Sequence, residues 1–214
     1  MKRFFGSIAA VLIACAVGAG GAMAAQPLLA PAELKDLLGQ PGVRIIDIRS
    51  PKAYEAQHIP GAVSAPYGVW RGPASNPGEL PEWPRLTALV QRLGLSSEVH
   101  AVVVYSGDDA TDFGAAARVV WTLKLMGLKE LSVLNGGVQA WVAAGLALDD
   151  KAERVQASTY IPVPDTAWIA TREDLLAPPA GVKPRLLDAR PAAFYKGETR
   201  HAASRVPGTL KGAV

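Results

Sequence analysis

Short apolar runs alternate with amphipathic stretches between residues 31 and 144. The apolar runs are rich in β-branched residues and bounded by glycine or proline, as in buried strands, whereas the amphipathic stretches repeat apolar residues at helical spacing. This alternation predicts an α/β fold, a parallel sheet with helices on both faces. The predicted strands span residues 43–48, 62–63, 100–105 and 131–134, and the predicted helices span residues 31–38, 51–57, 86–95, 113–126 and 138–144.

Two segments refine this picture. The strand at residues 100–105 is the most hydrophobic, so we expect it at the centre of the sheet, covered on both faces. Residues 66–84 are crowded with proline, glycine and tryptophan, which predicts a long ordered loop anchored by Trp70 and Trp83. In the helix at 113–126, the residues expected to face the core are Phe113, Ala116, Val120 and Leu123.

The pattern begins a second time 141 residues further along the chain. Residues 185–190 (RLLDAR) repeat residues 44–49 (RIIDIR), and residues 209–214 (TLKGAV) stand where residues 58–63 (HIPGAV) stand in the first copy. The second copy is too short to bury a core alone, so it is either truncated or packs on the first. We therefore assign a first domain to residues 27–150, a linker to 151–167 and the beginning of a second copy to 168–214, with an intramolecular interface between the domains.

Residues 1–25 have the features of a secretory signal peptide. Lys2 and Arg3 precede an apolar run without acidic residues, which ends in the small-x-small sequence of residues 22–24. The run is about long enough to span a membrane, but its second half is too weakly hydrophobic to hold there. We expect an exported protein, periplasmic or secreted, with no membrane span after cleavage. Residues 12–15 also fit a lipoprotein processing site, so a lipid anchor on Cys15 is the alternative.

Charge and cysteine content narrow the functional classes. Without Lys2 and Arg3 the chain has 20 basic and 19 acidic residues, so we expect no nucleic-acid partner. Cys15 is the only cysteine, so the part after the leader has neither a disulfide nor a thiol. The acidic residues near position 110 lack the spacing of a calcium loop, and we expect neither a metal nor a cofactor.

Four short motifs carry a family resemblance. They are Asp47-x-Arg49 at a strand end, Tyr54-x-x-x-His58-Ile-Pro-Gly61-Ala, the strand at 102–105 before a loop, and Leu-Asn-Gly-Gly at 134–137 with Trp141. Together they resemble rhodanese-family sulfurtransferases of the tandem two-domain kind. The resemblance covers residues 27–150 as a whole domain and 168–214 as the opening of a second, and it implies the rhodanese-like α/β fold.

The resemblance also implies a chemistry. In this family the loop after the central strand carries a cysteine that takes sulfur from thiosulfate, stores it as a persulfide and delivers it to cyanide or a thiol. The corresponding position is Ser106, whose hydroxyl is barely ionised near neutral pH and cannot hold a transferable persulfide. Nearby carboxylates would also oppose a dianion. We expect a catalytically silent first domain; its active-site-loop equivalent is Ser106, Gly107, Asp108, Asp109, Ala110, Thr111 and Asp112.

Single residues allow both structural and chemical interpretations. His58 could be a general base, but a lone histidine before Pro-Gly favours a hydrogen-bonded structural role. Asp47 and Arg49 could bind substrate, but their position favours pairing with each other and with the backbone. Ser106 lacks a glycine-flanked nucleophile elbow, which disfavours a serine hydrolase, and Asp112 is expected to cap the next helix. The fold-signature residues are Asp47, Arg49, His58, Gly61, Asp188, Arg190 and Gly212.

Two functions of different classes follow. In the first, the chain is the front part of a sulfurtransferase whose nucleophile lies beyond residue 214, near roughly position 250 if the repeat continues. In the second, it is a complete, non-enzymatic rhodanese-like module that binds a partner or an anion. A phosphatase relative would need a cysteine in the loop, which the first domain lacks. The coding sequence after codon 214 distinguishes the two: a strand followed by cysteine supports the first, a stop codon the second.

Overall fold

The computed structural model describes residues 25–178, 180–202 and 204–214. The expected signal peptide, including Cys15, therefore lies almost wholly outside the described residues. The chain divides into two compact units, Met1–Pro162 and Val163–Val214. Each unit is described by itself below. No helix in the described part of the chain is both long enough and apolar enough to cross a membrane.

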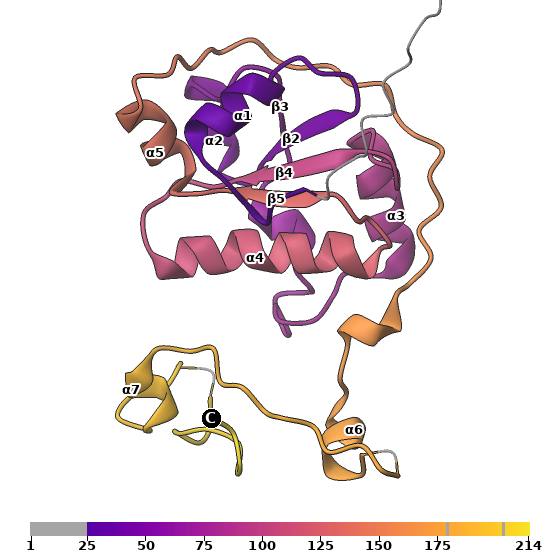
Figure 1. The fold of residues 1–214 in the computed structure, drawn as a ribbon, viewed down its shortest axis with the longest axis vertical. Helices are drawn as coiled ribbons and strands as arrows, with labels where there is room; N and C mark the ends of the chain where they lie inside the picture. The colour runs from indigo at the N-terminus through magenta and orange to yellow at the C-terminus, as the bar shows by residue number, and fades with distance from the viewer. Residues whose placement is uncertain (1–24, 179, 203) are drawn as a thin grey trace, which may run out of the picture. The chain divides into compact units, whose positions relative to one another are not determined.

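Unit 1 is built on a five-stranded sheet in the order β1-β5-β4-β2-β3, in which every pair of neighbours is parallel (Figure 1). The most hydrophobic strand, β4, lies at the centre, as its continuous apolar character predicts. The sequence pattern did not reveal the edge strand β1, which has only two residues. The strands are β1 (Leu28–Leu29), β2 (Val43–Asp47), β3 (Ala62–Ser64), β4 (His100–Val104) and β5 (Leu131–Leu134).

Helices cover both faces of this sheet, which confirms the predicted fold class (Figure 1). Successive side chains of a strand point to opposite faces, so Ile46 and Val103 pack with α3 and α4, whereas Ile45 and Val102 pack with α1, α2 and α5. The helical elements are α1 (Pro31–Leu37), α2 (Pro51–Ala56), the 3-10 helix η1 (Tyr67–Trp70), α3 (Trp83–Arg92), α4 (Ala110–Leu125) and α5 (Gly137–Ala143).

The structure corrects the prediction for residues 66–84, which are not one long loop. Trp70 belongs to η1, is fully buried, and donates its indole N–H to the Ala65 carbonyl oxygen over 3.0 Å. Trp83 is partly buried, packs against the core that contains Trp70, and begins α3. Both tryptophans therefore anchor the segment to the core, as predicted, and Trp70 also bonds to the backbone.

Helix α4 also differs from its prediction. It begins at Ala110, three residues earlier than expected, and Phe113 is 38% exposed although it was expected in the core. The Phe113 ring lies edge-on to Tyr105, with ring centroids 5.8 Å apart. Ala116 and Leu123 are fully buried, and Val120 is partly buried against the core. Starting the helix earlier places Phe113 in its first turns, beside the loop.

The segment assigned as a linker follows the surface of unit 1 up to Pro162. Its Ser158 hydroxyl donates to the Leu95 carbonyl oxygen over 2.6 Å, and the Tyr160 hydroxyl donates to that of Met126 over 2.8 Å. Val155 and Tyr160 pack on the core that contains α3 and α4. Residues 153–160 of the predicted linker at 151–167 therefore form an ordered segment on unit 1, called the strap below. The boundary between the two units lies after the strap, between Pro162 and Val163, and still within the predicted linker.

The described residues of unit 2 have little regular structure and form no buried core. Its elements are the 3-10 helix η2 (Thr166–Trp168), α6 (Arg172–Leu176) and α7 (Ala192–Tyr195). The strand expected near residues 185–188 is not formed, although the Asp188 amide donates to the Val214 carbonyl oxygen and the Val214 amide to that of Leu186. None of the described residues from 163 to 214 is buried.

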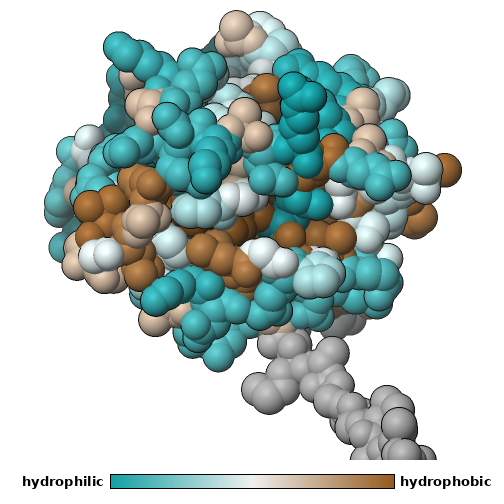
Figure 2. Space-filling view, turned by 90° about the horizontal axis from the view of Figure 1, so that it is seen from above, coloured by the Kyte–Doolittle hydropathy of each residue, from teal (hydrophilic) through white to brown (hydrophobic). Residues whose placement is uncertain are grey.

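The surface of unit 1 is mostly hydrophilic on the face seen from above, with smaller hydrophobic areas between polar side chains (Figure 2). Among the described residues of this unit, the large hydrophobic side chains that are exposed are Leu28, Phe113, Val142 and Ile161.

Candidate functional site

The loop after β4 lies at the carboxyl edge of the sheet. Because all strands are parallel, their carboxyl ends meet at this edge, where open α/β sheets bind their ligands. Tyr105 is buried, and burial raises the pKa of its phenol. Ser106 and Gly107 are half-buried, and Asp108 and Asp109 are exposed. The position predicted as decisive, Ser106, therefore lies where the fold presents residues to a ligand.

Two glycines hold this loop against the turn that precedes α5. The amides of Val138 and Gln139 donate to the carbonyl oxygens of Tyr105 and Ser106 over 2.9 Å and 3.0 Å. Gly137 has φ +61°, and a Cβ atom there would lie 2.6 Å from the Gly107 nitrogen. A Cβ atom on Gly107 would clash with the Gly136 carbonyl. The predicted Asn-Gly-Gly turn thus supports the loop through close backbone contact.

Three carboxylates surround the loop, each with a different partner. Asp112 Oδ2 accepts from the amides of Gly107 and Asp108, over 2.8 Å and 3.2 Å. Asp109 Oδ1 accepts from the amides of Thr111 and Asp112, over 2.8 Å and 2.9 Å. Asp108 Oδ1 accepts from the Gln139 side chain over 2.6 Å.

These contacts correct the predicted capping of α4. Asp109, not Asp112, is the N-cap residue, and Asp112 turns back over the loop from the first turn of the helix. The reason is local: with two carboxylates three residues apart, Asp109 caps the helix while Asp112 accepts from the amides of Gly107 and Asp108, which precede the cap. The Asp-x-x-Asp spacing could have indicated this division. No sequence signal pointed to Gln139.

No histidine of unit 1 serves Ser106 as a base. His100 lies at the opposite end of β4, where its Nε2 is 2.8 Å from the Ser132 hydroxyl. Burial lowers the pKa of His100, and the nearby Glu130 carboxylate partly offsets this. His58 is 1% exposed and has other partners. The arrangement disfavours a serine hydrolase, as the sequence indicated.

His58 joins α2 to the segment after α5. Its Nδ1 is 2.8 Å from the Tyr54 carbonyl oxygen and its Nε2 is 3.1 Å from that of Lys151. The ring stacks on Tyr54 with centroids 4.0 Å apart, and Asp149 Oδ1 lies 3.5 Å from Nε2. Backbone bonds between His58 and Asp149 run in both directions. This geometry supports the structural interpretation of His58, because neither ring nitrogen is open to a substrate.

Asp47 and Arg49 form the predicted pair at the end of β2. The Arg49 guanidinium donates to both Asp47 oxygens, with Nη2 2.7 Å from Oδ2, and the Arg49 amide also donates to Oδ1. Nη2 further donates to the Gln57 carbonyl oxygen over 2.7 Å. Asp47 is fully buried. The pair therefore fixes the end of α2 to the sheet, and the turn at Gly61, with φ +79°, leads from there into β3.

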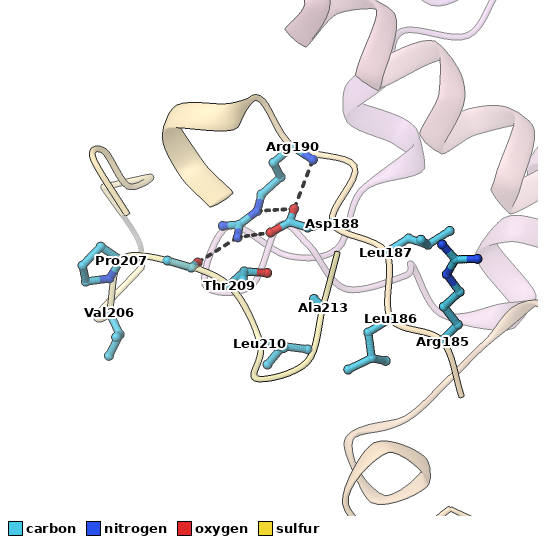
Figure 3. Close-up of a pocket in the computed structure, with 11 residues that line it drawn as sticks. Arg185, Leu186, Leu187, Asp188, Arg190, Val206, Pro207, Thr209, Leu210 and Ala213 are labelled. Atoms are coloured by element: carbon cyan, nitrogen blue, oxygen red, sulfur yellow. Dashed lines mark hydrogen bonds and ion pairs between the residues drawn. The ribbon is translucent and has the colours of Figure 1, made fainter. Parts of the chain in front are cut away.

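The same bonding occurs in unit 2 around Asp188 and Arg190 (Figure 3). The Arg190 guanidinium donates to Asp188 over 2.9 Å and 2.6 Å, and to the Gly208 carbonyl oxygen over 2.8 Å. Hydrogen bonds from Arg190 and then Thr209 hold the pKa of Asp188 far below its usual range. Tyr195 donates its hydroxyl to the Ala213 carbonyl oxygen, as Tyr54 does to that of Ala62. Gly212 has φ +86°.

The pair in unit 2 is far more open than the pair in unit 1. Arg190 is 47% exposed at its side chain, against 10% for Arg49. It borders an open cavity of about 580 Å³, which contains apolar side chains as well as the ion pair (Figure 3). These residues are Arg185, Leu186, Leu187, Asp188, Arg190, Val206, Pro207, Gly208, Thr209, Leu210 and Ala213.

Unit 1 thus combines a parallel sheet, a loop after its central strand and the Asp47–Arg49 pair at the end of β2. These are the features of a rhodanese-like domain. The family model described as "Rhodanese-like domain" matches residues 30–144, more than half of the chain. The chain therefore belongs to the rhodanese family.

Several similar proteins are named as thiosulfate sulfurtransferases. A thiosulfate sulfurtransferase of Pseudomonas aeruginosa is 34% identical over 190 residues, covering 86% of this chain and 67% of the relative. The thiosulfate sulfurtransferase of Bos taurus is 32% identical over 167 residues, covering 73% of this chain and 55% of the relative. The chain thus spans between about half and two thirds of the length of such relatives.

Solved structures agree on the fold. The 3-mercaptopyruvate sulfotransferase SseA of Escherichia coli superposes with a TM-score of 0.69 at 23% identity, covering 87% of this chain and 73% of that chain. The anaerobic ergothioneine biosynthesis enzyme of Chlorobium limicola gives a TM-score of 0.69 at 19% identity, covering 88% and 49%. At these identities the likeness shows the fold alone.

Proposed function

We propose that this chain is the front part of an exported two-domain sulfurtransferase. The enzyme would move sulfane sulfur from thiosulfate to a thiol or cyanide through a cysteine persulfide. Its nucleophile would lie in the remainder of the second domain, near roughly position 250 by continuation of the repeat. Unit 1 would be a non-catalytic partner domain that packs on the completed second domain.

The observation that carries the proposal is that the bonding around Asp47 and Arg49 is repeated in unit 2 around Asp188 and Arg190. A carboxylate, an arginine two residues later, a tyrosine hydroxyl and a left-handed glycine recur with the same partners as in unit 1. The match to the Pseudomonas aeruginosa relative extends over 190 residues, more than the 162 of unit 1. Both facts support a second rhodanese-like copy that begins in unit 2.

Chemistry supports a silent unit 1. Sulfur transfer to cyanide breaks the S–S bond of thiosulfate, releases sulfite and leaves the outer sulfur on a thiolate until the acceptor takes it. Ser106 stands at the position where that thiolate is needed, and residues 26–214 contain no cysteine. A serine hydroxyl is a much weaker nucleophile at neutral pH than a cysteine thiolate.

The test compares two proteins, both without residues 1–25. One ends at Val214, and the other contains whatever the gene encodes beyond codon 214. We expect the longer protein to form thiocyanate from thiosulfate and cyanide, and to lose this activity when a cysteine in its added part is replaced by serine. The shorter protein should form none. Activity of the shorter protein would contradict the silent-domain proposal.

The absence of any thiol after the leader favours a second candidate, a non-enzymatic module that binds a protein partner or an anion. A native stop codon directly after codon 214 would favour this module over the enzyme.

Export can be tested separately. We expect the protein in the periplasm or medium, with residues 1–25 removed. A Cys15→Ser variant distinguishes the two processing routes: it should still be exported if a signal peptidase cuts after the small-x-small sequence, and should lose membrane attachment only if Cys15 is acylated.

A further inference from the structure

The loop after β4 already holds an anion that belongs to the chain itself. The amides of Gly107 and Asp108 converge on one oxygen of Asp112, over 2.8 Å and 3.2 Å. Consecutive backbone N–H groups that point to one spot form an anion-binding nest. We propose that the Asp112 carboxylate occupies this nest and closes the loop of unit 1 to small external dianions such as thiosulfate. This inference rests on the proposed function, which assigns the loop to the family's anion-binding position.

The three carboxylates of the loop divide into distinct roles. Asp109 caps α4 by accepting from the amides of Thr111 and Asp112, and so it fixes the position of Asp112 in the first turn of the helix. Asp108 accepts from the side chain of Gln139 and leaves the backbone amides alone. Asp112 is therefore the carboxylate that takes the two loop amides, whereas Asp108 contributes its charge without occupying them.

The backbone on the other side of Gly107 is held by the turn before α5. Gln139 and Val138 donate to the carbonyl oxygens before Gly107, and Gly107 lies in direct backbone contact with the turn at Gly136. An entering dianion would have to displace the Asp112 carboxylate, which is held nearby by α4 and therefore competes as an intramolecular ligand. The loop is thus closed to a dianion because Asp112 already occupies the two amides, in addition to the general repulsion by the nearby carboxylates.

Asp108→Ala and Asp112→Ala form a matched pair, because each removes one negative charge but only the second empties the nest. Each protein, ¹⁵N-labelled and spanning residues 26–214, is titrated with thiosulfate at constant ionic strength while the amide signals of Gly107 and of residue 108 are followed. We expect saturable shifts for Asp112→Ala, with binding at least about tenfold tighter than for Asp108→Ala or the unaltered chain, since two charge-assisted hydrogen bonds become available.

Equal binding by both variants would overturn the proposal, because charge alone would then explain the exclusion. Thiosulfate binding at these amides that is as tight in the unaltered chain as in Asp112→Ala, or no shifts in a folded Asp112→Ala protein, would overturn it too. These measurements follow binding and not catalysis. They therefore test the proposal even if the longer protein shows no sulfurtransferase activity.

Discussion

Buried polar residues in unit 1 are used to join segments of chain. Asp47 is fully buried and bonded to Arg49, and His58 is 1% exposed with both ring nitrogens near carbonyl oxygens. A buried polar group without a partner is costly, so such residues are bound tightly to their surroundings. Asp47, Arg49 and His58 therefore hold α2 and the segment after α5 to the sheet.

Whether the partner of a side chain could be predicted depends on how far apart the two residues lie in the sequence. The Asp47–Arg49 pair spans two residues at a strand end, so its pairing followed from the sequence. The prediction gave the cap of α4 to Asp112, but Asp109 caps it, because either residue can cap a helix that begins nearby and only the exact start decides. The contact of Gln139 with Asp108 joins residues 31 positions apart, which no local pattern reveals.

Replacing Gly137 by alanine should destabilise unit 1 by about 2–4 kcal/mol, because a left-handed conformation and a backbone clash act together. The new Cβ would lie 2.6 Å from both the Gly107 nitrogen and the Tyr105 oxygen. Urea unfolding followed by tryptophan fluorescence measures the change. Gly114→Ala is the control: this site in α4 has open space, so alanine should stabilise by up to about 1 kcal/mol. Equal effects at the two sites would contradict this account.

His100 should make unit 1 less stable in acid. Burial lowers the pKa of His100 from its ordinary value of 6.5, so the unfolded chain binds this proton more readily than the folded one. Its contribution is therefore fully present above the unfolded value and is lost as pH falls through the lowered folded value. Urea unfolding at several pH values between about 5 and 8 measures this loss. His100→Gln should reduce the pH dependence in that window; an unchanged slope would exclude His100 as its source.

At the scale of elements, the strands and helices with a long periodic pattern were predicted well, whereas the shortest strand and the start of one helix were not. In strand β4 four consecutive apolar residues follow His100, and this character predicts its place at the centre. Strand β1 has two residues and pairs only because β5 presents a free edge, so the pattern carries no signal for it. Phe113 was expected in the core because it matched the helical period, but it lies in the first turn of α4 and is 38% exposed.

The strap at residues 153–160 should contribute to the stability of unit 1. Tyr160→Phe removes the hydroxyl that donates to the Met126 carbonyl oxygen, and we expect a loss of about 1 kcal/mol in the free energy of unfolding. Chemical denaturation of the chain without residues 1–25 measures it. Thr159 is exposed, so Thr159→Ala should change stability by less than about 0.5 kcal/mol. If both changes were neutral, the strap would be bound too weakly to count as part of the domain.

At the scale of the whole molecule, the two units differ in how they could be stable. Unit 1 has two hydrophobic clusters on either side of its sheet, whereas no described residue of unit 2 is buried. The Arg190 side chain of the Asp188–Arg190 pair is 47% exposed, and ion pairs that are open to water contribute little to stability. The backbone bonds between residues 186–188 and Val214 therefore lack a core to protect them.

Hydrogen exchange tests this contrast. In the chain that ends at Val214, we expect peptides from β2, β4 and β5 to be strongly protected and peptides from residues 185–214 to exchange within seconds, since protection requires burial as well as hydrogen bonding. In a longer protein that completes a second sheet, the amides of Asp188 and Val214 should become protected together. Strong protection of residues 185–214 in the shorter chain would instead mean that unit 2 gains its stability by packing on another surface, and a second sheet would not be needed to explain it.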